Sequence, residues 1–144
     1  MIKEKLDELF TKIFHITKVE DIGFHKIENG KLKPIYKTNM GELSIETWQK
    51  MHGNNPVYIE NNPILQEVVS SKKTVAISNT REDNRTTDDV NSFNIHSLMM
   101  IPVIDFGVVT GVIPIVSIDK QHHFSNDEIS KCEALVQEYL LYLI

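Results

Sequence analysis

The residues best placed to do chemistry lie at the two ends of a long polar segment, residues 79–94, set between two apolar runs. Five candidate side chains lie near its start, near its end and at the beginning of the following run: Arg81, Asp83, Phe93, His96 and Ser97. A polar segment of this length between two strands is typically either functional or disordered. An apolar floor with a few convergent polar groups is the usual composition of a small-molecule site. We therefore expect a ligand cavity between the sheet and this segment, which would act as its lid.

Two aromatic side chains outside this segment, Trp48 and Tyr58, complete the set of predicted ligand-binding residues. Each stands in sequence of mixed polarity, where core packing explains an aromatic ring at least as well as ligand contact does. The alternative for the segment itself is that its charges form a solvated face. In that case Phe93 and Met99 would fill the space beneath it, and no cavity would remain.

Metal-binding and catalytic chemistry find little support among the remaining residues. The six histidines lack ligand spacing and companion cysteines, so hydrogen-bonded or surface histidine is the better interpretation. The single cysteine, Cys132, falls on the apolar face of the last predicted helix, with no base near it in the sequence. We interpret it as a buried structural thiol. No catalytic residue, metal ion or cofactor is predicted.

The elements that position these residues are organised around one hairpin, formed by residues 95–104 and 108–119. Both runs are rich in β-branched residues, and a short turn containing Gly107 joins them. Met99, Ile101 and Val103 alternate with residues that are also apolar, so both faces of this hairpin must be covered. Pro114 is unusual in a central strand, and it predicts a bulge or a missing ladder bond facing the pocket.

Local signals place the other elements. Asn29-Gly30 is a strong hairpin turn between two further strands, Ser44 and Asn62-Pro63 begin helices, and Ser125 with Glu128 forms a capping box. The expected elements are helix 2–14, strands 20–27 and 31–37, a short helix from 44, a helix from 62, strand 74–78 and helix 126–143. The prediction is a single α+β domain over residues 1–144, with a largely antiparallel sheet of five or six strands. The terminal helices would cover one face, and short helices and loops would cover a ligand pocket on the other.

Composition narrows the classes of partner. The chain has 144 residues and a formal net charge of −5, without a basic cluster, which argues against a nucleic-acid partner. The apolar runs are interrupted too often to predict a membrane span. A single cysteine and the lack of a signal-peptide pattern predict a cytoplasmic location.

The ordered set of these motifs resembles the GAF domain family, small sensory modules related in architecture to PAS domains. The resemblance extends over nearly the whole chain and is clearest from Asn62 to Leu143. Residues 74–79 look like the third strand of the family, 95–103 like the fourth, 107–113 like the fifth, and 124–128 like the entry to its last helix. The resemblance implies a sensory domain with a small-molecule pocket.

Members that bind cyclic nucleotides carry an Asn-Lys, a Phe and an Asp-Glu in the last region. The matching positions here are Asp119-Lys120, Phe124 and Asp127-Glu128. The Asn is replaced by Asp and the Phe-to-Asp gap is one residue shorter, so the resemblance does not extend to a cyclic-nucleotide site. It does imply that Lys120 approaches Asp127.

Three functions follow from this resemblance, in order of preference. The first is a non-catalytic module that binds a small polar or aromatic molecule and signals through its terminal helices, which would also form a homodimer. The second is a dimerisation or scaffold module with a vestigial pocket. The third is an enzyme similar to the free-methionine sulfoxide reductases, which resemble GAF domains but work through several cysteines, whereas this chain has one. The sequence identifies neither the ligand nor the output partner.

Overall fold

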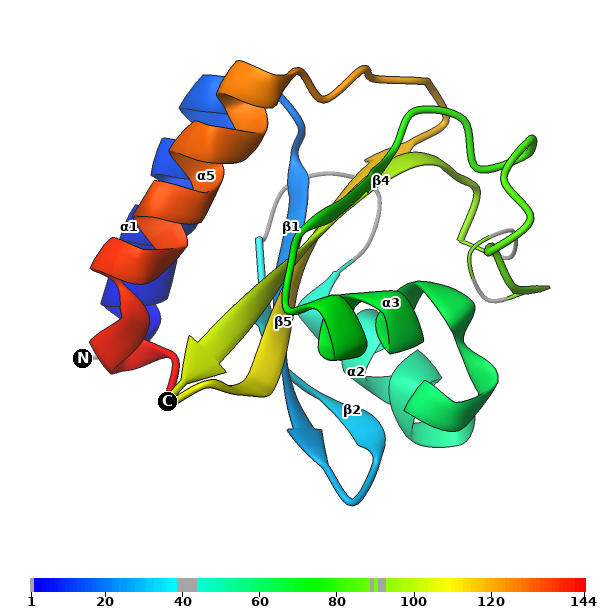
Figure 1. The fold of residues 1–144 in the computed structure, drawn as a ribbon, viewed down its shortest axis with the longest axis horizontal. Coiled ribbons are helices and arrows are strands. Elements are labelled where there is room, and N and C mark those ends of the chain that lie inside the picture. Colours follow the sequence, from blue (N-terminus) through cyan, green and yellow to red (C-terminus); the bar gives the residue numbers. More distant parts are fainter. Residues whose placement is uncertain (1, 39–43, 89, 91–92) are drawn as a thin grey trace.

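An antiparallel five-stranded sheet forms the centre of the molecule, with strands in the order β2-β1-β5-β4-β3 (Figure 1). The structure is a computed structural model that describes residues 2–38, 44–88, 90 and 93–144. The strands are β1 (Asp21–Glu28), β2 (Lys31–Lys37), β3 (Val75–Ile77), β4 (Ile95–Asp105) and β5 (Val108–Ile118). The predicted α+β class with a largely antiparallel sheet is confirmed.

Two hairpins build most of this sheet. The turn between β1 and β2 has positive φ at Asn29 (53°) and Gly30 (74°), as the Asn-Gly signal predicts for a type I′ turn. The turn between β4 and β5 has the same signs at Phe106 (49°) and Gly107 (77°). Because β5 also pairs with β1, the two hairpins join into one continuous sheet.

Two helices at the ends of the chain, α1 (Ile2–Thr17) and α5 (Asn126–Glu138), lie side by side over one face of the sheet (Figure 1). They bury Met99, Ile101 and Val103 of β4 in a common core. Both predicted boundaries need correction. The first helix continues three residues beyond 14, and the last α-helix ends at Glu138, well before 143, followed by the 3₁₀ turn η2 (Leu140–Tyr142).

The opposite face of the sheet is covered by α2 (Ile45–Asn54), the 3₁₀ turn η1 (Ile59–Asn61) and α3 (Pro63–Ser71). The predicted caps are present, since the side chains of Ser44 and Asn62 accept hydrogen bonds from backbone N–H groups in the first turns of α2 and α3. Leu98 of β4 packs into this second core with α3. No helix of the described residues is long and apolar enough to cross a membrane.

The start of α5 is fixed by a complete capping box. The Ser125 side chain accepts a hydrogen bond from the Glu128 backbone N–H, and the Glu128 carboxylate accepts one from the Ser125 N–H. The expected approach of Lys120 to Asp127 is wrong. Asp127 instead pairs with Lys131 one helical turn away, at 3.0 Å, because an i,i+4 partner on the same helix lies within easy reach.

Replacing Ser125 by Ala should lower the free energy of unfolding by about 1 kcal/mol, because a backbone N–H at the helix start loses its partner. Thermal and denaturant unfolding would measure this. Ser70→Ala, in the last turn of α3, is a matched control whose side chain caps no helix start and should change stability far less. Equal effects of the two substitutions would contradict the assigned role of the cap.

Candidate functional site

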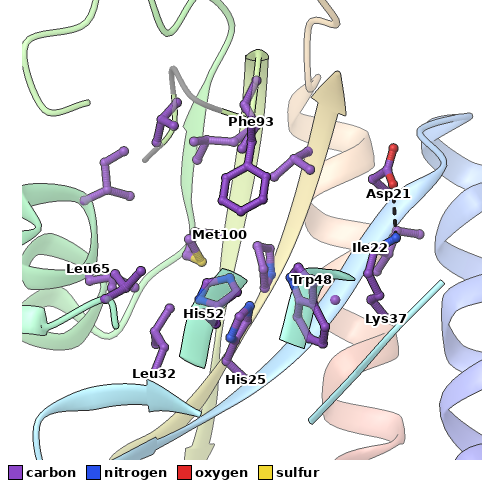
Figure 2. A pocket seen from close by; sticks show the side chains of 18 of the residues that line it. Asp21, Ile22, His25, Leu32, Lys37, Trp48, His52, Leu65, Phe93 and Met100 are labelled. Carbon is purple, nitrogen blue, oxygen red and sulfur yellow. Dashed lines mark hydrogen bonds and ion pairs between the residues drawn. The ribbon is translucent and has the colours of Figure 1, made fainter. Parts of the chain in front are cut away.

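A cavity of about 100 Å³ lies between the sheet and the helices α2 and α3 (Figure 2). Its floor is formed by β1, β2, β4 and β5, and its cover by side chains of α2, α3 and the residues that connect them. The lining is mostly aliphatic, and includes Leu32, Ile64, Leu65, Leu98, Met100 and Val116. The segment predicted as a lid contributes less, since Val90 and Phe93 are the lining residues between 79 and 94 in the described part of the chain. Residues 89, 91 and 92 of that segment lie outside the described residues.

Two of the seven sequence-predicted site residues, Trp48 and Phe93, line this cavity. Trp48 is buried on α2, and Phe93 approaches from the residues just before β4. Tyr58 is exposed and borders a neighbouring surface hollow, which shares His52 and Phe93 with the cavity.

The two predicted charged residues are held by other partners, outside the cavity lining. The guanidinium of Arg81 donates to the Asn94 side chain at 2.7 Å. Asp83 accepts two hydrogen bonds from the Arg85 guanidinium, at 2.9 and 2.7 Å, and these bonds lower the pKa of Asp83. Arg85 in turn pairs with Glu67 of α3 at 2.9 Å, so these charges tie the segment to the neighbouring helix.

The last two predicted residues, His96 and Ser97, also lie outside the cavity lining. His96 places its Nε2 atom 3.4 Å from the Arg81 guanidinium. The buried Ser97 hydroxyl donates to the Ser78 carbonyl at 2.5 Å and accepts from the His122 backbone N–H at 2.8 Å. These bonds give Ser97 a structural role, joining β4 to the ends of β3 and β5.

Four rings form one wall of the cavity, and two of them, His25 and His52, were not among the predicted residues. Figure 2 shows His25, His52 and Trp48 beside one another, with Phe93 close to His52. The ring centroid of His25 lies 4.9 Å from that of Trp48 and 4.8 Å from that of His52, and both pairs are arranged edge-on. His52 and Phe93 are stacked at 6.1 Å. These separations are in the range that aromatic pairs prefer.

A buried ion pair closes one end of the cavity. Lys37 Nζ lies 3.3 Å from Asp21 Oδ1, with side chains only 4% and 8% exposed, and this pair is drawn as a dashed line in Figure 2. Lys37 Nζ also donates to the Thr38 carbonyl at 2.9 Å. Both residues stand at the meeting point of β1 and β2, so the ion pair also fixes that edge of the sheet.

Gly23 and Pro114 shape the floor. Pairing of β1 with β5 passes from Ile22–Ile115 to His25–Val112, so Gly23 stands opposite Pro114 in the part of the ladder that is skipped. This is the missing ladder bond that the proline predicted, because Pro has no N–H to donate. A Cβ on Gly23 would lie 3.2 Å from the Trp48 ring, so the glycine allows that ring to approach the strand.

Burial, and the neighbouring His52 as the smaller cause, hold the pKa of His25 well below its usual range. The ring is 2% exposed, and water cannot solvate its charged form there. His25 is therefore neutral in the folded protein at neutral pH.

Lowering the pH should destabilise the fold through His25. The unfolded chain takes up a proton near pH 6.5 while the folded chain does not, so this contribution is complete above that pH and is lost as the pH falls below it. The loss is about 1.4 kcal/mol one pH unit below the unfolded pKa. Denaturant unfolding between neutral and mildly acidic pH would measure it. The slope of the unfolding free energy against pH should decrease in His25→Phe. It should persist in His15→Gln, which alters an exposed histidine. Identical slopes in the two variants would contradict the assignment to His25.

Neither a cluster of metal-ligating side chains nor a cysteine lies in the described lining of this cavity. Among the described residues, no cluster of three or more His, Cys, Asp or Glu side chains could hold a metal ion. Cys132 is buried in the core on the other side of the sheet, where burial raises the pKa of its thiol to about 12. The mostly aliphatic and aromatic lining of the cavity is suited to contact with an apolar molecule.

The domain model of the GAF family, described as "GAF domain", matches residues 2–139. The chain belongs to the GAF domain family. The match covers all the strands of the sheet and both terminal α-helices, and it ends one residue before η2. No curated protein matches the chain by sequence.

Solved structures of other GAF domains have the same fold at low sequence identity. The GAF domain/HD domain protein from Geobacter sulfurreducens superposes with a TM-score of 0.81 at 14% identity, covering 99% of this chain and 91% of that one. The GAF domain of a two-component sensor histidine kinase from Bacillus halodurans gives 0.73 at 14%, covering 99% and 93%. A type II free methionine-R-sulfoxide reductase from Thermoplasma acidophilum gives 0.75 at 17%, covering 99% and 92%. At these identities the likeness shows the shared GAF fold, which sensory proteins and an enzyme both use.

Proposed function

We propose that this GAF domain is a non-catalytic sensory module that binds a small molecule in the cavity beneath α2 and α3. The observation that carries the proposal is the cavity itself, a mostly apolar space with the buried imidazole of His25 on its wall. Clefts of this composition, with few polar groups, are typical small-molecule sites. The family membership and the sensor kinase among its structural neighbours support a regulatory role.

Strand β4 lies between the cavity and the terminal helices, and this position supports signalling through those helices. Leu98 and Met100 of β4 line the cavity, while Met99 and Ile101 between and beside them pack against α1 and α5. One strand therefore contacts the bound molecule on one face and the terminal helices on the other. A displacement of β4 on binding would move the packing of both helices, since close-packed cores transmit small shifts.

A cavity-filling variant tests this function. The small-molecule fraction of a lysate from the source cells should raise the melting temperature of the wild-type protein, and native mass spectrometry should show the added mass. Val116→Phe fills the cavity from β5 and should abolish both effects. Val108→Phe adds the same ring at an exposed position on the same strand and should abolish neither. Retention of the effects by Val116→Phe would refute the cavity as the binding site.

The reductase alternative depends on Cys132, the only cysteine of the chain. Its raised pKa and its burial away from the cavity argue against a thiolate nucleophile, because the thiolate is the reactive form. We expect no thiol-dependent reduction of free methionine sulfoxide. Iodoacetamide should label Cys132 only after unfolding, and rapid labelling of the folded protein would reopen the reductase alternative.

Dimerisation is the second candidate, favoured by apolar residues left exposed at the two ends of the chain. Ile2, Leu141 and Ile144 are all more than half exposed, and such surface near two packed helices is suited to a second copy. We propose a homodimer through the terminal helices, in the cytoplasm. Light scattering at high micromolar concentration should give the dimer mass, and Leu141→Glu should reduce it to the monomer; a monomeric wild-type protein would contradict the dimer.

A further inference from the structure

We infer that the molecule bound in the cavity is an uncharged, single-ring aromatic compound that carries one hydrogen-bonding group and rests against the four-ring wall of His25, Trp48, His52 and Phe93. This inference depends on the proposed function, because it names the chemical class of the ligand for the same cavity. Four features of the cavity support it: the shape of the wall, the size of the space, the pairing of the charged side chains and one buried nitrogen atom.

The wall offers aromatic surface in a fixed arrangement. Trp48 and His52 are four residues apart on α2 and therefore share one face of the helix, with their ring centroids 5.7 Å apart. His25 from β1 contacts both rings edge-on, at 4.9 and 4.8 Å. Because aromatic pairs gain free energy beyond the burial of their area, a flat aromatic molecule gains more from this wall than an aliphatic one of equal size.

The space limits the ligand to about one ring. The cavity measures about 100 Å³, while an apolar cavity of about 150 Å³ in another protein binds benzene. Facing the rings are aliphatic side chains from the floor and cover, among them Leu98, Met100 and Val116. They favour an apolar ring and provide no hydrogen bonds from their side chains.

The charged side chains of the lining leave no counter-ion for a charged ligand. Asp21 and Lys37 pair with each other at 3.3 Å, and Lys37 also donates to the Thr38 carbonyl. His25 carries no charge in the folded protein, as its burial dictates. A carboxylate or ammonium ligand would lose its hydration and would find Asp21 and Lys37 already paired with each other, so it would bind more weakly than a neutral ligand. The ligand is therefore uncharged.

One polar group of the ligand has a defined partner. His25 is 2% exposed, and its Nδ1 atom has no hydrogen-bond partner within the described structure. The ring borders the cavity (Figure 2). A buried polar atom without a partner costs free energy that a bound group can recover. The ligand group donates to Nδ1 or accepts from it, depending on the tautomer of the imidazole.

Three single-ring probes separate these requirements, of which phenol and toluene are nearly equal in size. Phenol provides a neutral ring with a hydroxyl, toluene replaces the hydroxyl by a methyl group, and benzoate replaces it by a charge. Binding is measured by calorimetry and by the fluorescence of Trp48, the only tryptophan of the chain and part of the wall. We expect phenol and toluene to bind and benzoate to bind at least 10-fold more weakly than phenol. Binding of benzoate as tight as that of phenol would overturn the neutral-ligand class.

His25→Phe isolates the hydrogen bond while keeping a ring in the wall. The ratio of the phenol and toluene dissociation constants should shift about 10-fold against phenol in this variant, which corresponds to the loss of one hydrogen bond. Should the variant fail to fold, the wild-type protein provides the second measurement: phenol should shift the His25 Nδ1 nitrogen resonance and toluene should not. An unchanged ratio, or an unmoved resonance with phenol bound, would remove His25 from the site and overturn the inference.

The probes also separate this inference from the proposed function. If the cell-derived fraction stabilises the wild-type protein but not Val116→Phe, and none of the three probes binds, the ligand class is wrong and the function of the cavity stands. If neither the fraction nor the probes bind, both are wrong.

Discussion

Lys37→Met should lower the free energy of unfolding by about 3–5 kcal/mol, because the substitution leaves the Asp21 carboxylate buried without its partner ammonium. The Asp21 and Lys37 side chains are 8% and 4% exposed and lie 3.3 Å apart. A buried charge that loses a partner of opposite charge does not regain its lost hydration. Denaturant unfolding of the wild type and the variant would measure the difference.

Lys33→Met is the matched control on the same strand. Lys33 pairs with Glu28 at 3.1 Å, but these side chains are 57% and 48% exposed, so the pair should contribute at most about 1 kcal/mol. The double variant Asp21→Asn/Lys37→Met should recover part of the loss, because it removes both buried charges. Similar effects of Lys37→Met and Lys33→Met would show that burial of the ion pair is not what stabilises this edge of the sheet.

Gly111→Ala should lower the free energy of unfolding by about 1–3 kcal/mol, the usual cost of forcing an extra methyl group into a packed site. A Cβ at this position would lie 2.7 Å from the His25 carbonyl oxygen and 3.0 Å from the Phe24 ring. Strands β1 and β5 would have to separate at this point to make room for the methyl group. Thermal unfolding would measure the loss.

Gly53→Ala, the same kind of substitution, should not lower the free energy of unfolding. Gly53 lies in α2, and nothing lies within 4 Å of its added Cβ, so alanine should be neutral or stabilise the protein by up to about 1 kcal/mol. If both substitutions had the same effect, backbone flexibility rather than the close approach of β1 and β5 would explain the result.

Elements with local signals could be predicted from the sequence. The Asn29-Gly30 turn, the caps at Ser44, Asn62 and Ser125, and the apolar alternation along β4 all depend on residues close together in the chain. Local hydrogen bonds and side-chain periodicity determine such features. The division of β4 into one face toward the terminal helices and one toward the cavity is therefore confirmed.

The position of the cavity could not be predicted in the same way. The sequence suggested a lid from the polar segment because Arg81 and Asp83 are charged, but Arg81 bonds to Asn94 and Asp83 to Arg85. The four-ring wall depends instead on how α2 packs over β1, which no local pattern encodes. Two signals were available: the i,i+4 spacing of Trp48 and His52, and the place of His25 on the same face of β1 as Gly23.

A crystal structure of the protein purified without added ligands, and then soaked either with phenol or with the small-molecule fraction of the lysate, shows whether the cavity beneath α2 and α3 is a small-molecule site. We expect difference density for a flat ring against Trp48 and Phe93, within hydrogen-bond distance of His25. A well-ordered cavity whose space is filled by the side chains of Phe93 and Met100, with no density for a bound molecule, would contradict it and favour the scaffold function.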